Sequence, residues 1–246
     1  MPTYNDYGIV LTSYSFSEAD KILNIYTRNN GLVRAIGKGI KKPTSRFGGK
    51  TGQLSCCYFH FAKGKNLDIL SDCEQINAFP KLRGDLIRLT YGMLFVEIVS
   101  SFAYEMESES THIYELLYSA LDKLQITEIP DLFSIRFIME FLSIHGFRPQ
   151  LETCVSCSKN ISYEGSRDYF PFSSILGGLL CNKCSHSIDH KKININVLQL
   201  LGINDELNNI HPIKQEDIRL ALELVREHTD MRGKNKIKTF DLVFSL

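Results

Sequence analysis

Residues 154–157 read Cys-Val-Ser-Cys, and residues 181–184 read Cys-Asn-Lys-Cys after 23 intervening residues. Two cysteines three positions apart can curl around one ion while the turn between them presents backbone N–H groups to the thiolates. Two such pairs supply four sulfurs, the ligand set of a closed tetrahedral zinc site. Because a closed site leaves no position for water or substrate, the spacing predicts one structural Zn²⁺. Its ligands would be Cys154, Cys157, Cys181 and Cys184.

Two other interpretations of these cysteines stay open. The four could be unrelated buried thiols, or one pair could be a redox-active CxxC motif. The redox interpretation is less favoured, because we expect neither pair to follow a strand and open a helix. His186 and His190 lie nearby as spare ligands, but four cysteines already complete a zinc shell.

The composition limits the classes of function that fit the chain. Its 246 residues suffice for one large domain or for two to three small ones. The 28 basic and 28 acidic residues cancel, so any contact with nucleic acid must depend on where charge gathers. No apolar run reaches about 18 residues, which predicts no membrane span. The first residues lack the layout of a signal peptide, and the cysteine pattern suits a reducing cytosol. We therefore expect a cytoplasmic protein.

The first 79 residues have the pattern of a small β-barrel. Asn30-Gly31 predicts a hairpin, because this pair tolerates positive φ at both central positions of a turn. Five short antiparallel strands suit a closed barrel better than a sandwich, and an OB-fold is the leading candidate. The expected strands cover residues 8–14, 21–27, 32–36, 54–61 and 67–76.

A basic loop follows the third of these strands. No acidic residue interrupts its six cations, and its glycines predict a mobile backbone that could follow a phosphate chain. The six are Arg34, Lys38, Lys41, Lys42, Arg46 and Lys50. Five aromatic residues could stack on bases, although the barrel core is the better expectation for each. They are Tyr14, Phe16, Tyr26, Phe47 and Tyr58. The alternative is a solvated loop. Gly49-Lys50-Thr51 resembles the end of a P-loop, but Thr44 stands where its first glycine belongs.

The remainder of the chain is mostly helical. Apolar residues recur at spacings of three and four, which predicts helices over 80–104, 112–124, 130–146, 194–201 and 215–228. The basic residues from Arg232 to Lys238 could form a second phosphate contact or a solvated tail. The expected class is α+β, with the zinc module inserted in a helical domain. The expected division is 1–79 (OB-fold), 80–150 (helical, first part), 151–190 (zinc module) and 191–246 (helical, C-terminal part).

Together these features resemble the bacterial RecO family of recombination mediators, over nearly the whole chain. The most specific matches are the run from Lys42 to Gly49 and the cysteine frame. Further matches are Gly8-Ile-Val-Leu, Ser17–Asp20, Gly31–Ala35, Gly37-Lys-Gly, Gly146-Phe-Arg-Pro and the stretch from Gly177 to Cys184. The chain departs from the family pattern at two places. Residues 170–174, which lead to the paired glycines Gly177-Gly178, match the family's usual sequence less closely. Ser158 also stands where zinc knuckles often have glycine.

The resemblance implies an OB-fold DNA-binding domain, a helical body and a zinc module. It implies binding of single- and double-stranded DNA, annealing of complementary strands and no catalytic side chain. The implied partners are RecR, sometimes RecF, and the single-strand-binding protein, in loading a recombinase on gapped DNA. It also implies a cytoplasmic, nucleoid-associated location.

Two rival functions remain. A zinc-ribbon module that binds only proteins would show no salt-dependent affinity for oligonucleotides. A zinc deaminase needs an H-x-E segment before a P-C-x-x-C segment, and the chain has neither.

Overall fold

The computed structural model describes residues 1–47, 49–105, 108–162, 169–202 and 213–246. They form two compact units, Met1–Glu128 and Ile129–Ser245, and each is described by itself. The predicted domain boundaries at residues 79, 150 and 190 stay predictions. None of the helices in the described ranges combines the length and the apolar character that a bilayer span requires.

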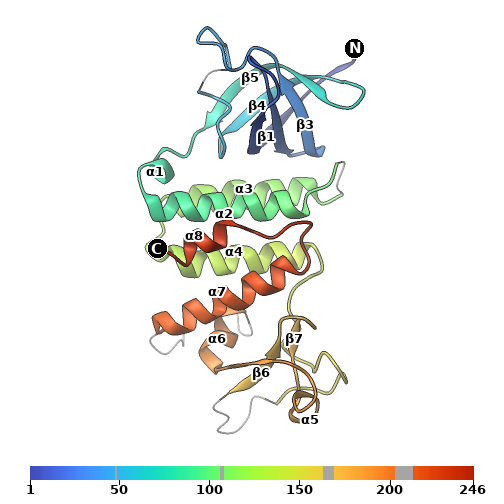
Figure 1. The fold of residues 1–246 in the computed structure, drawn as a ribbon, viewed down its shortest axis with the longest axis vertical. Coiled ribbons are helices and arrows are strands. Elements are labelled where there is room, and N and C mark those ends of the chain that lie inside the picture. The colour runs from blue at the N-terminus through green and yellow to red at the C-terminus, as the bar shows by residue number, and fades with distance from the viewer. Residues whose placement is uncertain (48, 106–107, 163–168, 203–212) are drawn as a thin grey trace. The chain divides into compact units, whose positions relative to one another are not determined.

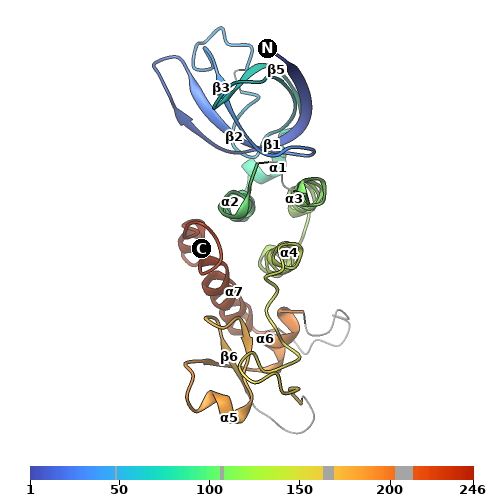
Figure 2. The same cartoon turned by 90° about the vertical axis from the view of Figure 1, so that its right-hand side faces the viewer.

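The first unit contains the predicted five-stranded barrel. Its strands are β1 (Thr3–Ser15), β2 (Lys21–Thr27), β3 (Gly31–Gly37), β4 (Cys56–Ala62) and β5 (Asp68–Asn77). They close in the order β1-β2-β3-β5-β4, with β4 returning to pair with β1 (Figures 1 and 2). This closure confirms the OB-fold prediction. One expectation was wrong: β3 and β5 pair in parallel, because the long connection through β4 brings β5 back in the direction of β3.

Alternation along the strands builds the barrel core. On β4, Cys57, Phe59 and Phe61 are buried inside, whereas Tyr58 and His60 between them are only half-buried. The β2–β3 hairpin is present, but only Gly31 has positive φ (63°), so the turn differs from the predicted type. The buried carboxylate of Asp6 secures it by accepting hydrogen bonds from Asn29 and from the Asn30 side chain.

Three helices complete the first unit. They are α1 (Pro80–Arg83), α2 (Leu86–Phe102) and α3 (Ser110–Leu124). Helices α2 and α3 lie side by side and contact the barrel strands (Figures 1 and 2). A single helix over 80–104 was a wrong prediction, because Asp85 caps a new helix by accepting a hydrogen bond from the Arg88 N–H. Leu86, the first residue of α2 after this cap, is 70% exposed.

The second unit combines helices with a small sheet. Its helices are α4 (Pro130–Ile144), α5 (Asn182–Ser185), α6 (Ile195–Leu200), α7 (Gln215–Asp230) and α8 (Thr239–Val243). Strands β6 (Phe170–Ser173), β7 (Gly178–Leu179) and β8 (Lys191–Ile193) form a sheet in the order β7-β6-β8. Helix α7 packs on α4 and α6, and its apolar stripe of Ile218, Ala221, Leu222 and Val225 is buried. Helix α8 was not predicted.

Candidate metal centre and nucleic-acid interface

The four predicted ligand cysteines come together in the second unit. Their sulfur atoms all lie within 4.8 Å of one another. The Sγ atoms of Cys157 and Cys181 are 3.7 Å apart, which is far longer than a disulfide bond. Four sulfurs at about 2.3 Å from one zinc ion would lie about 3.8 Å apart. The cluster therefore fits a tetrahedral metal site by the donor set and by this distance.

The first pair lies in a tight turn that brings both thiols to the cluster. The Ser158 N–H donates to the Cys154 carbonyl at 2.8 Å, and the Cys154 N–H donates to the Lys159 carbonyl at 2.8 Å. Ser158 takes the left-handed conformation, with φ of 59°, that glycine supplies more readily. Serine in place of glycine at position 158 therefore adds backbone strain, while the turn keeps its left-handed conformation.

The second pair stands at the start of a helix. Cys181 follows strand β7 and is the N-cap of α5, which contains Cys184. The expectation that neither pair follows a strand and opens a helix was therefore wrong for this pair, because β7 and α5 are too short to show in the hydrophobic pattern. The four-sulfur cluster still favours metal binding, since a redox motif uses one pair rather than two.

The environment lowers the pKa of Cys154 and Cys181 and so favours their thiolates, which are the form that binds metal. Burial opposes ionisation of Cys154, but the backbone N–H groups of Cys181, Ser156 and Cys157 outweigh it and lower its pKa to about 6. The Ser156 hydroxyl favours the Cys184 thiolate, yet the neighbouring Cys181 and Cys157 sulfurs raise the pKa of Cys184 to about 12. A divalent cation would remove this repulsion between thiolates.

The spare histidines are not part of the cluster. Among the described residues, the group of possible metal ligands here contains only the four cysteines. His186 is exposed, and His190 places its Nδ1 2.9 Å from the Ile188 carbonyl oxygen. The site thus needs no histidine ligand.

Gly178 holds the two cysteine turns together. The Leu179 N–H donates to the Gln150 carbonyl and the Val155 N–H donates to the Leu179 carbonyl, both at 2.9 Å. A Cβ on Gly178 would lie only 2.2 Å from the Gln150 carbonyl oxygen and 2.7 Å from a Val155 methyl group. The close approach of β7 to Gln150 and Val155 therefore has a steric requirement for glycine at position 178.

We expect Gly178→Ala to destabilise the second unit by about 1–3 kcal/mol, the usual cost of overpacking. The added methyl group would push the first cysteine turn away from β7. Urea denaturation of the two proteins measures the change. Gly84→Ala is the matched control, because Gly84 has negative φ and its Cβ would have no neighbour closer than 3.9 Å. Equal losses in both variants would refute the steric explanation.

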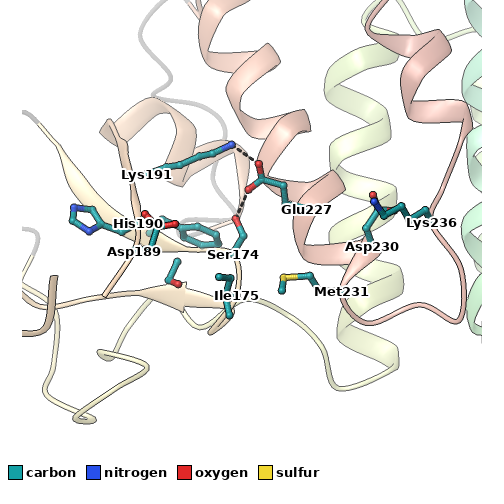
Figure 3. Close-up of a pocket in the computed structure, with 11 residues that line it drawn as sticks. Ser174, Ile175, Asp189, His190, Lys191, Glu227, Asp230, Met231 and Lys236 are labelled. Carbon is teal, nitrogen blue, oxygen red and sulfur yellow. Dashed lines mark hydrogen bonds and ion pairs between the residues drawn. The ribbon is translucent and has the colours of Figure 1, made fainter. Parts of the chain in front are cut away.

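A cavity of about 510 Å³ lies where the small sheet meets α7 (Figure 3). Glu227 of α7 accepts a hydrogen bond from the Ser174 hydroxyl at 2.8 Å and forms an ion pair with Lys191 at 2.5 Å. Asp230 accepts a hydrogen bond from the Ile237 N–H at 2.8 Å. Because these polar groups already have partners, they connect rather than bind a ligand: Ser174 and Lys191 attach the region of the small sheet to Glu227 of α7.

All six predicted DNA-contacting cations are exposed on the barrel unit. Arg34 lies on β3, and the other five lie in the connection between β3 and β4. The predicted mobile backbone was wrong for the described part of this connection, because Ile40 and Phe47 are buried in the barrel core. The cations therefore project from an anchored loop.

The β1–β2 turn fixes one end of this loop. The Asp20 carboxylate accepts a hydrogen bond from the Gly39 N–H at 2.7 Å, and this bond lowers the pKa of Asp20. The Lys41 N–H donates to the Ala19 carbonyl at 3.0 Å, while the Lys41 ammonium donates to the Ser17 carbonyl at 2.6 Å. Lys41 is thus partly engaged within the barrel, and Asp20 is an acidic neighbour that the linear sequence did not reveal.

The aromatic residues divide between core and surface. Tyr26 and Phe47 are buried, as expected, and Tyr58 is half-buried. Tyr14 and Phe16 are 44% and 57% exposed, so the core expectation was wrong for both. The Arg34 guanidinium donates to the Tyr14 hydroxyl at 3.1 Å, which places an open aromatic ring beside a predicted phosphate contact.

The C-terminal basic stretch is not uniformly solvated. Arg232 is half-buried and donates a hydrogen bond to the His228 carbonyl at 2.9 Å. Lys234, Lys236 and Lys238 are exposed. Arg232 therefore secures the end of α7 and is a poor candidate for a phosphate contact.

Comparison with known proteins gives concordant matches along the chain. The family model "Recombination protein O N terminal" matches residues 1–79, and "Recombination protein O C terminal" matches residues 83–239. "DNA repair protein RecO" of Rubrobacter xylanophilus is 34% identical, over 75% of this chain and 72% of that protein. The protein of the same name from Heliobacterium modesticaldum is 28% identical, over 92% of this chain and 81% of that protein.

Proposed function

Because the chain belongs to the RecO family of DNA repair proteins, we propose that it is a non-enzymatic mediator of recombinational repair. It binds single- and double-stranded DNA, promotes annealing of complementary strands and helps to load a recombinase on gapped DNA. Its partners in this proposal are RecR, in some cases RecF, and the single-strand-binding protein.

The observation that supports DNA binding is the group of six exposed cations on the OB-fold, Arg34 on β3 and the other five on the anchored loop that follows it. Each cation that contacts a phosphate releases condensed counterions, which drives binding without reading the base sequence. Neutralising the phosphates of two strands also lowers their mutual repulsion, so complementary bases can pair. The exposed rings of Tyr14 and Phe16 lie on the β1 and β1–β2 region and could stack on unpaired bases.

The cysteine module has a structural role in this proposal. Cys154, Cys157, Cys181 and Cys184 would hold one Zn²⁺, whose chemistry here is to bind thiolates and replace the core that a small module lacks. The module then stays folded against α7 through Glu227.

Salt-titrated binding of a labelled oligonucleotide tests the proposal. If all six cations contact phosphates, log K should fall with log salt concentration with a slope of about −4 for single strands. The triple variant Lys38→Ala, Lys42→Ala, Arg46→Ala should flatten this slope by about 2. Lys41 is kept, because its ammonium helps to anchor the loop.

The triple variant Lys81→Ala, Lys123→Ala, Lys214→Ala is the charge-matched control. These three lysines are exposed and lie outside the loop, so the slope should stay that of the parent protein. An oligonucleotide affinity that is absent even at low salt would favour the rival, a zinc-ribbon module that binds only proteins. Equal slopes in all three proteins would remove the loop from the DNA interface.

A further inference from the structure

The outer surface of β1, β4 and β5 carries a second group of side chains that the DNA proposal does not use. In the strand register, Tyr7 lies opposite Tyr58, and Tyr58 lies opposite Glu74. One step along, His60 lies opposite Asp72. Directly opposed residues of antiparallel strands share a surface, with Cβ atoms about 4.5–5.5 Å apart. We call these five residues the aromatic–acidic face.

The rings of this face form one continuous surface. The Tyr7 and Tyr58 ring centroids are 4.7 Å apart, and those of Tyr58 and His60 are 5.2 Å apart with nearly perpendicular planes. Tyr7 is 41% exposed, whereas a tyrosine that belongs to the barrel core would have most of its ring buried. The alternate residues on β4, Phe59 and Phe61, already fill the barrel interior. The rings are therefore available to a ligand.

The carboxylates of the face have no ion-pair partner in the part of the chain that the structure describes. Asp72 and Glu74 are both exposed, and neither forms an ion pair with a residue in the described ranges. The Asp72 carboxylate only accepts a hydrogen bond from the adjacent Cys73 N–H, at 2.9 Å. None of the six DNA-contacting cations lies on these three strands. Two carboxylates beside open rings would repel a phosphate chain and attract a cation.

We propose that the aromatic–acidic face binds an arginine-bearing segment of a partner protein. A guanidinium can stack flat on the Tyr58 ring, which lies directly opposite Glu74, while it donates N–H groups sideways to that carboxylate. The Tyr7 ring beside Tyr58 extends the aromatic surface for the rest of the segment. A lysine ammonium offers a point charge and no flat surface, so the face should prefer arginine. The barrel would then hold DNA by its β3–β4 loop and a protein segment by β1, β4 and β5.

Fluorescence anisotropy with a labelled peptide of alternating glycine and arginine tests this inference. The full chain should bind the arginine peptide at least about fivefold more tightly than a lysine peptide of equal length and charge. Glu74→Gln, which keeps the side-chain shape, and Tyr7→Ser should each reduce that preference to less than about twofold. Glu18→Gln is the matched control, because Glu18 is an exposed acid of the same barrel outside the face.

DNA is left out of the peptide titration, because arginine peptides bind phosphates themselves. Oligonucleotide affinity is measured separately, and Tyr7→Ser and Glu74→Gln should leave it unchanged. Equal binding of both peptides, or an arginine preference that survives both variants, overturns the inference. A loss of single-strand affinity in Tyr7→Ser also overturns it, and shows instead that the rings stack on bases.

Discussion

Cys154→Ser is expected to release the bound metal and to lower the unfolding free energy of the second unit by several kcal/mol. Zinc supplies about 10–16 kcal/mol in zinc-finger peptides, where binding and folding are coupled. Here the three-stranded sheet is small, and Cys154 is the cysteine of the cluster that is buried. Elemental analysis should find about one zinc per chain in the parent protein and almost none in the variant. Thermal unfolding should begin at a lower temperature in the variant.

Cys56→Ser is the control for this experiment. Cys56 is buried in the barrel beside the Tyr114 hydroxyl, so its loss should affect stability but leave the zinc content at one. Thiol counting distinguishes the redox alternative, because a chelator should make four more cysteines reactive in the metal-bound protein. A parent protein that is free of metal and melts at the same temperature with or without chelator would refute the zinc site.

Mild acid is expected to destabilise the second unit through His228. This side chain is 1% exposed on α7, and its Nε2 lies 2.6 Å from the Phe147 carbonyl oxygen. Its Nδ1 has no hydrogen-bond partner in the described part of the chain. Burial, reinforced by the nearby positive charge of Arg232, lowers the pKa of His228 to about 4, although the bond to Phe147 acts the other way.

The sign of the effect follows from the two pKa values. An unfolded histidine takes up a proton below about pH 6.5, whereas folded His228 does so only near pH 4. The unfolded state therefore binds more protons between these values, so stability is complete above pH 6.5 and falls as the pH decreases. The loss should approach about 2 kcal/mol at pH 5 and about 3 kcal/mol at pH 4.

Urea midpoints of the parent protein and of His228→Gln, measured from pH 7.5 to pH 4, test this expectation. Glutamine can keep the hydrogen bond to Phe147 but does not titrate. The difference between the two proteins at each pH cancels contributions that both share, including acid release of metal from the cysteines. The difference should shrink steadily as the pH falls. A constant difference would show that His228 is not the group responsible.

The sequence was most informative where one short-range pattern determines the structure. Strand β2 has the predicted bounds, because apolar residues and the turn at Gly31 define both of its ends. Helix α7 begins at the predicted Gln215, and the apolar residues that recur along it are buried. The cysteine spacing likewise predicted a cluster that the fold brings together.

Most of the errors arise where distant residues decide the outcome, whereas the break between α1 and α2 has a local cause. The end of α1 depends on the cap at Asp85, a signal that the apolar pattern of the surrounding helices obscured. Exposure of Tyr14 and Phe16 depends on which residues fill the barrel, and aromatic content alone does not reveal that choice. Ile40 and Phe47 anchor a loop whose glycines and lysines suggested free motion. Asp20 joins the basic loop only because β1 and β3 flank the same strand, β2.

The return of β4 to β1 also has a kinetic consequence. The pairing joins Thr3 to Ala62, so the first strand made during synthesis must wait for one of the last strands of the barrel. Contacts of such large sequence separation slow folding, because the chain between them must be ordered first. Until β4 has left the ribosome, β1 presents an unpaired edge to other chains, and closure of the ring removes that hazard of aggregation.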